Sequence, residues 1–211
     1  MLFISVCKHA EVDLVFVLDY SGSVKAGNFT LVKKFTKDFL RDADIDGGSV
    51  RVGVIVYSTD NKVAFNLNNF SSKAQVFNAI DAIPFKGGKT NTGSALETMR
   101  SEMFTVVNGD RPDVDNVAIV ITDGESHDNP ISVADLARDD GIDIFAIGIG
   151  GANQTELEGI ANKPSAQNVF TVEDFAGLDG LDKKVFTSVC SKSINYFVII
   201  FHGNFLKVLF T

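Results

Sequence analysis

Residues 12–23 of the chain read VDLVFVLDYSGS, an apolar run that leads directly into a loop of oxygen-bearing side chains. Positions 12–18 are almost continuously apolar, which is typical of a parallel strand buried on both faces of a sheet. Asp19, Ser21 and Ser23 then follow at alternate positions of a loop that contains a glycine, which permits a tight bend. The oxygens of these three side chains can therefore converge on one point.

Similar apolar runs recur along the chain and predict further strands. Buried strands are expected at residues 51–57, 117–122 and 142–149, and a last short strand at residues 168–172. Residues 62–66 follow the second strand after a turn that is too short for a helical crossover. This segment is therefore expected to pair antiparallel, as an edge strand.

Apolar residues at helical spacing predict helices between the strands and a final helix after the last one. They form three stripes, namely Phe29, Val32, Phe35 and Phe39; Leu96, Met99 and Met103; and Phe175, Leu178, Leu181, Val185 and Val189. The predicted fold class is α/β: a doubly wound, mostly parallel, Rossmann-like sheet with one antiparallel edge strand and helices on both faces. In such a sheet, ligands bind at the carboxyl ends of the strands where the strand order reverses.

Two further loops place oxygen atoms at this edge of the predicted sheet. Residues 87–93 read GGKTNTG before a predicted helix, and residues 122–124 read TDG at the end of a predicted strand. Asp, Ser and Thr oxygens without His or Cys favour a hard cation, and a compact set that retains water favours Mg²⁺ or Mn²⁺ over Ca²⁺. Taken singly, the same residues could be a helix cap, acceptors for loop amides and an ordinary turn.

The stretches DLVFVLDYSGSV, GGKTNTGSAL and VAIVITDGES resemble the three loops of the metal-ion-dependent adhesion site in von Willebrand factor type A domains. The stretches IFAIGIGGANQTELEGIA and NVFTVEDFAGLDGL resemble the final third of such domains in matrilins and non-fibrillar collagens of the collagen VI type. The resemblance divides the chain into an N-terminal segment (1–10), a type A domain (11–190) and a hydrophobic tail of atypical composition (191–211).

The resemblance also implies a ligand set and a function. The matching positions are Asp19, Ser21 and Ser23 in the first loop, Thr90 in the second and Asp123 in the third. In the family the hydroxyls ligate the metal directly, the aspartates directly or through water, and an acidic residue of a partner completes the shell. The implied function is extracellular adhesion or matrix assembly, in which the domain binds collagen or another matrix protein through the ion.

Two other functions are compatible with a metal at this place. One is a structural matrix module whose metal site is unused. The other is a Mg²⁺-dependent phosphohydrolase, but the haloacid-dehalogenase pattern requires an aspartate where this chain has Ser21, and no nucleophile has an evident general base. We therefore expect no enzyme. His127 could line the rim of the site, and the glycines at 148–151 lack the spacing of a dinucleotide loop and predict a tight turn.

Charge and hydropathy exclude other classes of partner. The net charge of -8 argues against binding to nucleic acid or an anionic membrane, because both require a concentrated basic face. The unbroken apolar part of the tail covers only residues 196–201, whereas a membrane-spanning helix needs about 20 residues. Membrane insertion is therefore not expected.

The cysteines and glycosylation sequons favour secretion into the extracellular space. Cys7 and Cys190 lie just outside the first and last predicted elements, where a disulfide could join the two ends of the domain. Two buried thiols of a cytosolic protein are the alternative. Sequons at Asn28, Asn69 and Asn153 are candidate glycosylation sites and support the extracellular interpretation.

Overall fold

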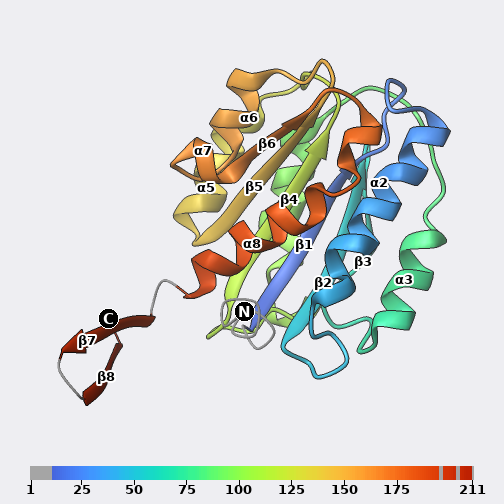
Figure 1. The fold of residues 1–211 in the computed structure, drawn as a ribbon. Helices are drawn as coiled ribbons and strands as arrows, with labels where there is room; N and C mark the ends of the chain where they lie inside the picture. Colours follow the sequence, from blue (N-terminus) through green and yellow to red (C-terminus); the bar gives the residue numbers. More distant parts are fainter. Residues whose placement is uncertain (1–10, 195–196, 203–204, 211) are drawn as a thin grey trace.

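The computed structural model describes residues 11–194, 197–202 and 205–210, with side chains described as far as residue 190. Within these residues, helices cover both faces of a central sheet (Figure 1). The strands of this sheet are β1 (Val12–Asp19), β2 (Val50–Tyr57), β3 (Asn61–Phe65), β4 (Asp115–Thr122), β5 (Ile142–Ile149) and β6 (Val169–Val172). The helices are α2 (Lys25–Phe39), α3 (Lys73–Asp81), α4 (Thr92–Thr98), α5 (Pro130–Asp139), α6 (Gln154–Ile160), α7 (Ser165–Asn168) and α8 (Leu181–Ile194).

The strand order of the sheet is β3-β2-β1-β4-β5-β6. β1 pairs in parallel with both β2 and β4, and β5 pairs in parallel with β4 and β6. β3 is antiparallel to β2 at one edge. After β1 the chain adds β2 and β3 on one side of it, and then adds β4, β5 and β6 on the other side. The strand order therefore reverses between β1 and β4. The predicted fold class is confirmed, including its antiparallel edge strand.

The central strand β1 shows why the sheet needs helices on both faces. Leu14, Phe16 and Leu18 pack into a core with α2, α3 and α8, whereas Val15 and Val17 pack into a second core with α4, α5 and α6. All five side chains are at most 2% exposed. Because each such side chain contributes about 1.5–3 kcal/mol when fully buried, both helical layers stabilise this strand.

Two of the three predicted apolar stripes form single buried helical faces. Phe29, Val32, Phe35 and Phe39 are the buried face of α2. The second stripe is also fully buried, but α4 ends at Thr98 and a π-helical turn, Met99–Met103, continues it.

The third predicted stripe is divided between two elements. A short 3₁₀ helix, η4 (Phe175–Leu178), precedes α8, and Asp179 and Gly180 separate them. Gly180 has a φ of +83°, a left-handed conformation that interrupts a helix. Helical spacing continued by coincidence across this turn, so the expectation of one continuous helix was wrong.

The glycine-rich segment after β5 forms a turn that packs against α6. Gly150 has a φ of +59°, and its N–H donates to the Val172 carbonyl oxygen at 2.9 Å. A Cβ atom on Gly148 would lie 2.3 Å from Leu157 Cδ1, so this glycine lets α6 approach β5 closely. Turn geometry and packing account for these glycines without a dinucleotide.

The C-terminal part contains the end of α8 and a separate hairpin. α8 continues past residue 190 to Ile194, and β7 (Phe197–His202) pairs antiparallel with β8 (Phe205–Phe210) in a two-stranded sheet of their own. Among the residues that the structure describes, no helix has both the length and the apolar character that a membrane span requires.

Cys190 lies near the end of α8, is 5% exposed and is disulfide-bonded. Cys7 and the predicted N-terminal segment 1–10 lie outside the described residues. The pairing of Cys7 with Cys190 therefore stays a prediction.

Candidate metal site

The predicted ligands lie in three loops at one edge of the sheet. Asp19 is the last residue of β1, Ser21 and Ser23 follow it, Asp123 comes directly after β4, and Thr90 lies two residues before α4. Because β1 and β4 are neighbouring parallel strands, their carboxyl ends meet where the strand order reverses.

Side-chain hydrogen bonds join the first and third loops. The Ser21 N–H donates to Asp19 Oδ1 at 2.8 Å, and the Oγ atoms of Ser21 and Ser23 are 3.1 Å apart. Ser23 Oγ donates to Asp123 Oδ1 at 2.7 Å, and Thr122 Oγ1 donates to Asp19 Oδ2 at 2.9 Å. Four of the five predicted ligands thus form one hydrogen-bonded cluster.

Thr90 is held beside this cluster by main-chain contacts. Its carbonyl oxygen accepts from the His127 N–H at 2.7 Å, and its loop is bonded to the first loop by the Gly22 N–H, which donates to the Gly88 carbonyl at 2.8 Å. Gly88 has a φ of +120°, and a Cβ atom there would lie 2.8 Å from Thr59 Oγ1. The second loop therefore needs glycine at position 88, both for this backbone conformation and to lie close to Thr59.

The two carboxylates of the cluster are in an environment that suits a cation. Asp19 is 2% exposed, and burial raises its pKa to about 6, although hydrogen bonds from Ser21 and Thr122 oppose the shift and the charge of Asp123 adds to it. Burial also raises the pKa of Asp123, opposed by the hydrogen bond from Ser23. A bound cation would stabilise both ionised forms, so the residues fit a metal ion.

The chemistry of the donor set fits a hard ion. Within residues 11–190, no three His, Cys, Asp or Glu side chains are grouped to hold a metal. The cluster instead combines the carboxylates of Asp19 and Asp123 with the hydroxyls of Ser21 and Ser23, and Thr90 lies in the adjacent loop. Oxygen donors of this kind suit Mg²⁺ or Mn²⁺.

The structure adds residues to the site that the sequence did not single out. Ser126 and Asp128 in the third loop bind backbone amides at the start of α4, and Glu156 of α6 accepts from the Ser126 N–H. His127, which was predicted to line the rim, is exposed, and its Nδ1 lies 3.2 Å from the Thr90 carbonyl oxygen. The sequence carries no strong signal for the other three, because each is a common capping or turn residue.

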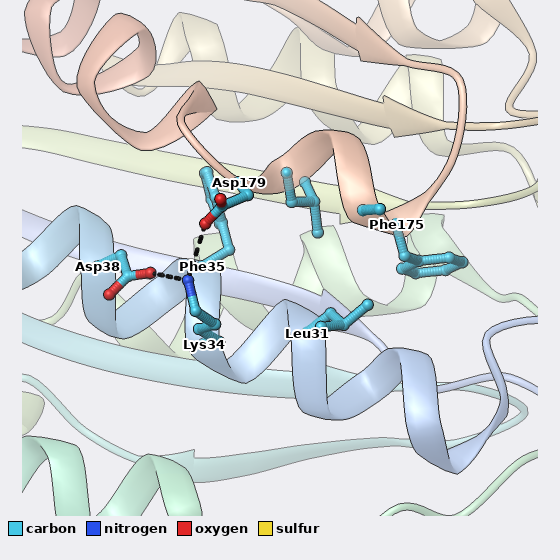
Figure 2. Close-up of a pocket in the computed structure, with 8 residues that line it drawn as sticks. Leu31, Lys34, Phe35, Asp38, Phe175 and Asp179 are labelled. Atoms are coloured by element: carbon cyan, nitrogen blue, oxygen red, sulfur yellow. Dashed lines mark hydrogen bonds and ion pairs between the residues drawn. The ribbon is translucent and has the colours of Figure 1, made fainter.

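A groove of about 350 Å³ lies elsewhere, between α2 and η4 (Figure 2). Its apolar lining includes Leu31, Phe35 and Phe175. Lys34 Nζ donates to Asp38 at 2.6 Å and to Asp179 at 2.9 Å, which joins the two walls. None of the predicted metal ligands lines this groove.

The three sequons differ in their surroundings. Asn28 is half-buried in the first turn of α2, and Asn69 is exposed in the turn after β3. Asn153 caps α6, where its side-chain oxygen accepts from the Glu156 N–H at 3.2 Å. Asn69 is the most accessible of the three, and glycosylation stays a prediction at all of them.

A strained residue follows the first loop. Lys25, the first residue of α2, is exposed and has a φ of +63°, a conformation that costs a residue other than glycine about 1–2 kcal/mol. We expect Lys25→Gly to be more stable than Lys25→Ala by about 1 kcal/mol, because both remove the side chain and only glycine relieves the strain. Urea denaturation of the two variants measures this difference, and equal stabilities would show that the conformation is not strained.

The fold and the site together define a Rossmann-like domain with a cluster of carboxylate and hydroxyl oxygens at its switch point. The chain belongs to the von Willebrand factor type A domain family, whose sequence model matches residues 13–184. The resemblance predicted from the three loops is confirmed at the level of the family.

Similar proteins include components of animal matrices. The chain is 38% identical over 185 residues to the collagen alpha-6(VI) chain of Mus musculus, which covers 88% of this chain and 8% of that one. It is 36% identical over 181 residues to matrilin-1 of Gallus gallus, which covers 86% of this chain and 37% of that one. The match therefore spans less than two fifths of the length of either relative.

Solved structures of proximal thread matrix protein 1 from the mussel byssus share the fold. One form has a TM-score of 0.81 and 31% identity, and the match covers 86% of this chain and 48% of that one. The same mussel protein, at 30% identity, has been solved with zinc occupying its MIDAS motif. A divalent metal in a metal-ion-dependent adhesion site (MIDAS) is thus known in a structural neighbour.

Proposed function

We propose that this domain is an extracellular adhesion or matrix-assembly module that binds a partner protein through a divalent ion. Asp19, Ser21, Ser23, Thr90 and Asp123 would hold the ion. The observation that carries this proposal is the convergence of three loops at the switch point, where Ser23 Oγ contacts Asp123 Oδ1 at 2.7 Å across 100 residues of sequence.

The ion in this proposal is Mg²⁺ or Mn²⁺. The donors are all oxygen atoms, and most are neutral hydroxyls, which suit small hard cations that keep bound water. Ca²⁺ prefers more ligands and a roomier site. The two carboxylates balance the formal charge of the ion, but its other donors would be neutral hydroxyls and water. The ion therefore stays electrophilic, and an anionic oxygen from outside could replace a bound water.

The partner in this proposal is an extracellular protein that presents an Asp or Glu side chain to the ion. Similarity to collagen VI and matrilin chains supports collagen or another matrix protein, and an extracellular location for the domain. The same similarity favours a binding module over a phosphohydrolase. Neither nucleic acid nor a membrane is proposed as a partner.

Thr90→Ala is expected to weaken metal-dependent partner binding by at least about tenfold, since even the loss of an outer-shell group commonly has this effect on metal affinity. Stability should change little, because Thr90 lies in a loop and its main-chain bonds remain. Surface plasmon resonance against immobilised collagens and matrilin-1, in Mg²⁺ and then in EDTA, measures this.

Thr90→Ser is the matched control, because it keeps the hydroxyl and removes only a methyl group. It should bind as the wild type does. If a partner bound equally well to all three proteins and in EDTA, the metal site would be unused and recognition would lie on another face of the domain.

A further inference from the structure

We propose that Glu156 of α6 is a positioning residue for the metal ligand Thr90, and that it acts through the loop segment Ser126–Asp128. This inference rests on the proposed metal-binding function. It deepens that function by linking a helix outside the three ligand loops to the geometry of the ion.

The first link is a buried carboxylate that holds the third loop. Glu156 is 9% exposed, and both of its carboxylate oxygens lie 3.1 Å from the Ser126 backbone nitrogen. A carboxylate with so little exposure is unfavourable unless it is hydrogen-bonded. The Ser126 N–H supplies that bond. Through it, Glu156 holds the Ser126 backbone against α6.

The second link is a set of hydrogen bonds from Ser126–Asp128 to the second loop. The His127 N–H donates to the Thr90 carbonyl oxygen at 2.7 Å, and the Thr92 N–H donates to Ser126 Oγ at 3.0 Å. The Gly93 N–H donates to Asp128 Oδ1 at 2.7 Å, and Ser126 Oγ donates to the same atom at 2.6 Å. The segment thus binds Thr90 itself and the first two residues of α4 that follow it, so a shift of Ser126 would shift the ligand.

The stability of α6 itself does not require this use of Glu156. Asn153 caps the helix, and its side-chain oxygen accepts from the Glu156 N–H at 3.2 Å. In a capping box the carboxylate three residues later would return to the N–H of the cap residue. Here it contacts Ser126, 30 residues away in sequence, so its role is to join α6 to the metal-binding loops.

Small displacements matter because the coordination of Mg²⁺ is strict. Its ligands must lie at about 2.0–2.1 Å in near-octahedral geometry. Groups that orient ligands from outside the coordination shell typically change metal affinity by about 10- to 100-fold when they are mutated.

Two conservative variants separate positioning from charge. Glu156→Gln removes the charge but keeps an acceptor oxygen at the same reach, whereas Glu156→Asp keeps the charge but withdraws it by one methylene. We expect Glu156→Asp to weaken Mn²⁺ binding by about 10- to 100-fold and Glu156→Gln to remain within about threefold of the wild type. Isothermal titration calorimetry with Mn²⁺ alone measures this.

Hydrogen exchange of the metal-free proteins is the second readout. The amides of Ser126 and His127 should exchange faster in Glu156→Asp than in the wild type or Glu156→Gln. Asp13→Ala is the control for a purely structural loss: Asp13 is also buried and also accepts from a loop amide, that of Arg111 at 2.6 Å, but it lies at the amino end of β1, opposite the site. It should lower thermal stability without changing Mn²⁺ affinity.

Three outcomes would overturn the inference. Wild-type affinity and exchange in both Glu156 variants would show that Glu156 does not position the loop, and the proposed metal function would stand. A loss in Glu156→Gln but not in Glu156→Asp would show that charge alone matters. Failure of the wild type itself to bind Mn²⁺ would remove this inference together with the proposed function.

Discussion

Asp19→Ala is expected to abolish both Mn²⁺ binding and metal-dependent partner binding, with a loss of more than about 100-fold, the upper end for groups outside the coordination shell. Asp19 supplies one of the two carboxylates of the cluster and also shapes the first loop. Its Oδ1 accepts from the Ser21 N–H and its Oδ2 from Thr122 Oγ1. The substitution therefore removes charge and the acceptor of the Ser21 N–H, and it leaves Thr122 Oγ1 only its contact with the Gly124 carbonyl oxygen at 3.2 Å. Calorimetry with Mn²⁺ and surface plasmon resonance against matrix proteins measure the two losses.

Asp19→Asn distinguishes the loss of charge from the collapse of the loop. It keeps the shape of the side chain and an acceptor oxygen, so it should fold with near wild-type stability and still bind Mn²⁺ poorly. If Asp19→Ala bound Mn²⁺ with wild-type affinity, the ion would lie at a different place and the proposed ligand set would be wrong.

The sheet could be predicted from the sequence because burial on both faces leaves a direct pattern. A strand such as β1 must be apolar at successive positions, since Leu14 and Val15 point into different cores. The antiparallel placement of β3 followed from the short connection that precedes it. Helical spacing was a less reliable guide. The apolar residues on either side of the turn at Asp179 and Gly180 keep helical spacing, so the spacing alone does not reveal the turn.

The convergence of the candidate metal ligands was predictable to the extent that it depends on strand ends. Asp19 directly follows an apolar run and Asp123 follows one after a single threonine, so a doubly wound sheet brings them to one edge. Thr90 follows no strand, and its assignment came from the resemblance to a family. The contacts that hold it come from His127 and the first loop, which only the tertiary structure brings together.

Glu156 illustrates what local pattern cannot supply. The sequence Asn153-Gln154-Thr155-Glu156 has the spacing of a capping box, which would account for the glutamate within its own helix. The choice of the carboxylate between the Asn153 amide and the Ser126 amide depends on where α6 packs. That packing depends in part on Gly148, which lets α6 approach β5 closely. Nothing in the sequence around Gly148 indicates a connection with the metal site.

Arg111→Ala is expected to lower the free energy of unfolding by about 3–5 kcal/mol, the usual effect of leaving a buried charge without its partner. Asp13 is 0% exposed and accepts from the Arg111 N–H at 2.6 Å and from Arg111 Nε at 2.8 Å. The guanidinium also donates to the carbonyl oxygens of Gly48 and Ser49 at 3.0 Å. Urea denaturation measures the loss, and Mn²⁺ affinity should be unchanged because this cluster is at the opposite end of β1.

The effect of Arg111→Ala should depend on pH in a defined direction. Burial raises the pKa of Asp13, and the hydrogen bonds and charge of Arg111 oppose that rise, so the pKa should increase further in the variant. A carboxyl group whose pKa is higher in the folded state binds its proton more tightly when folded, so protonation stabilises the fold. The variant should therefore regain stability relative to the wild type as the pH falls from about 7 through the raised pKa of Asp13.

Arg100→Ala is the control for this pH dependence, since Arg100 pairs with Asp140 on the surface, where the two side chains are 27% and 50% exposed. Its loss should be below about 1 kcal/mol. The difference in unfolding free energy between Arg100→Ala and the wild type should also stay constant over the same pH range, because Asp140 keeps its hydration when the arginine is removed. If Arg111→Ala lowered the free energy of unfolding equally at about pH 7 and about pH 4.5, the loss would come from the loop contacts of the guanidinium and not from the unpaired charge of Asp13.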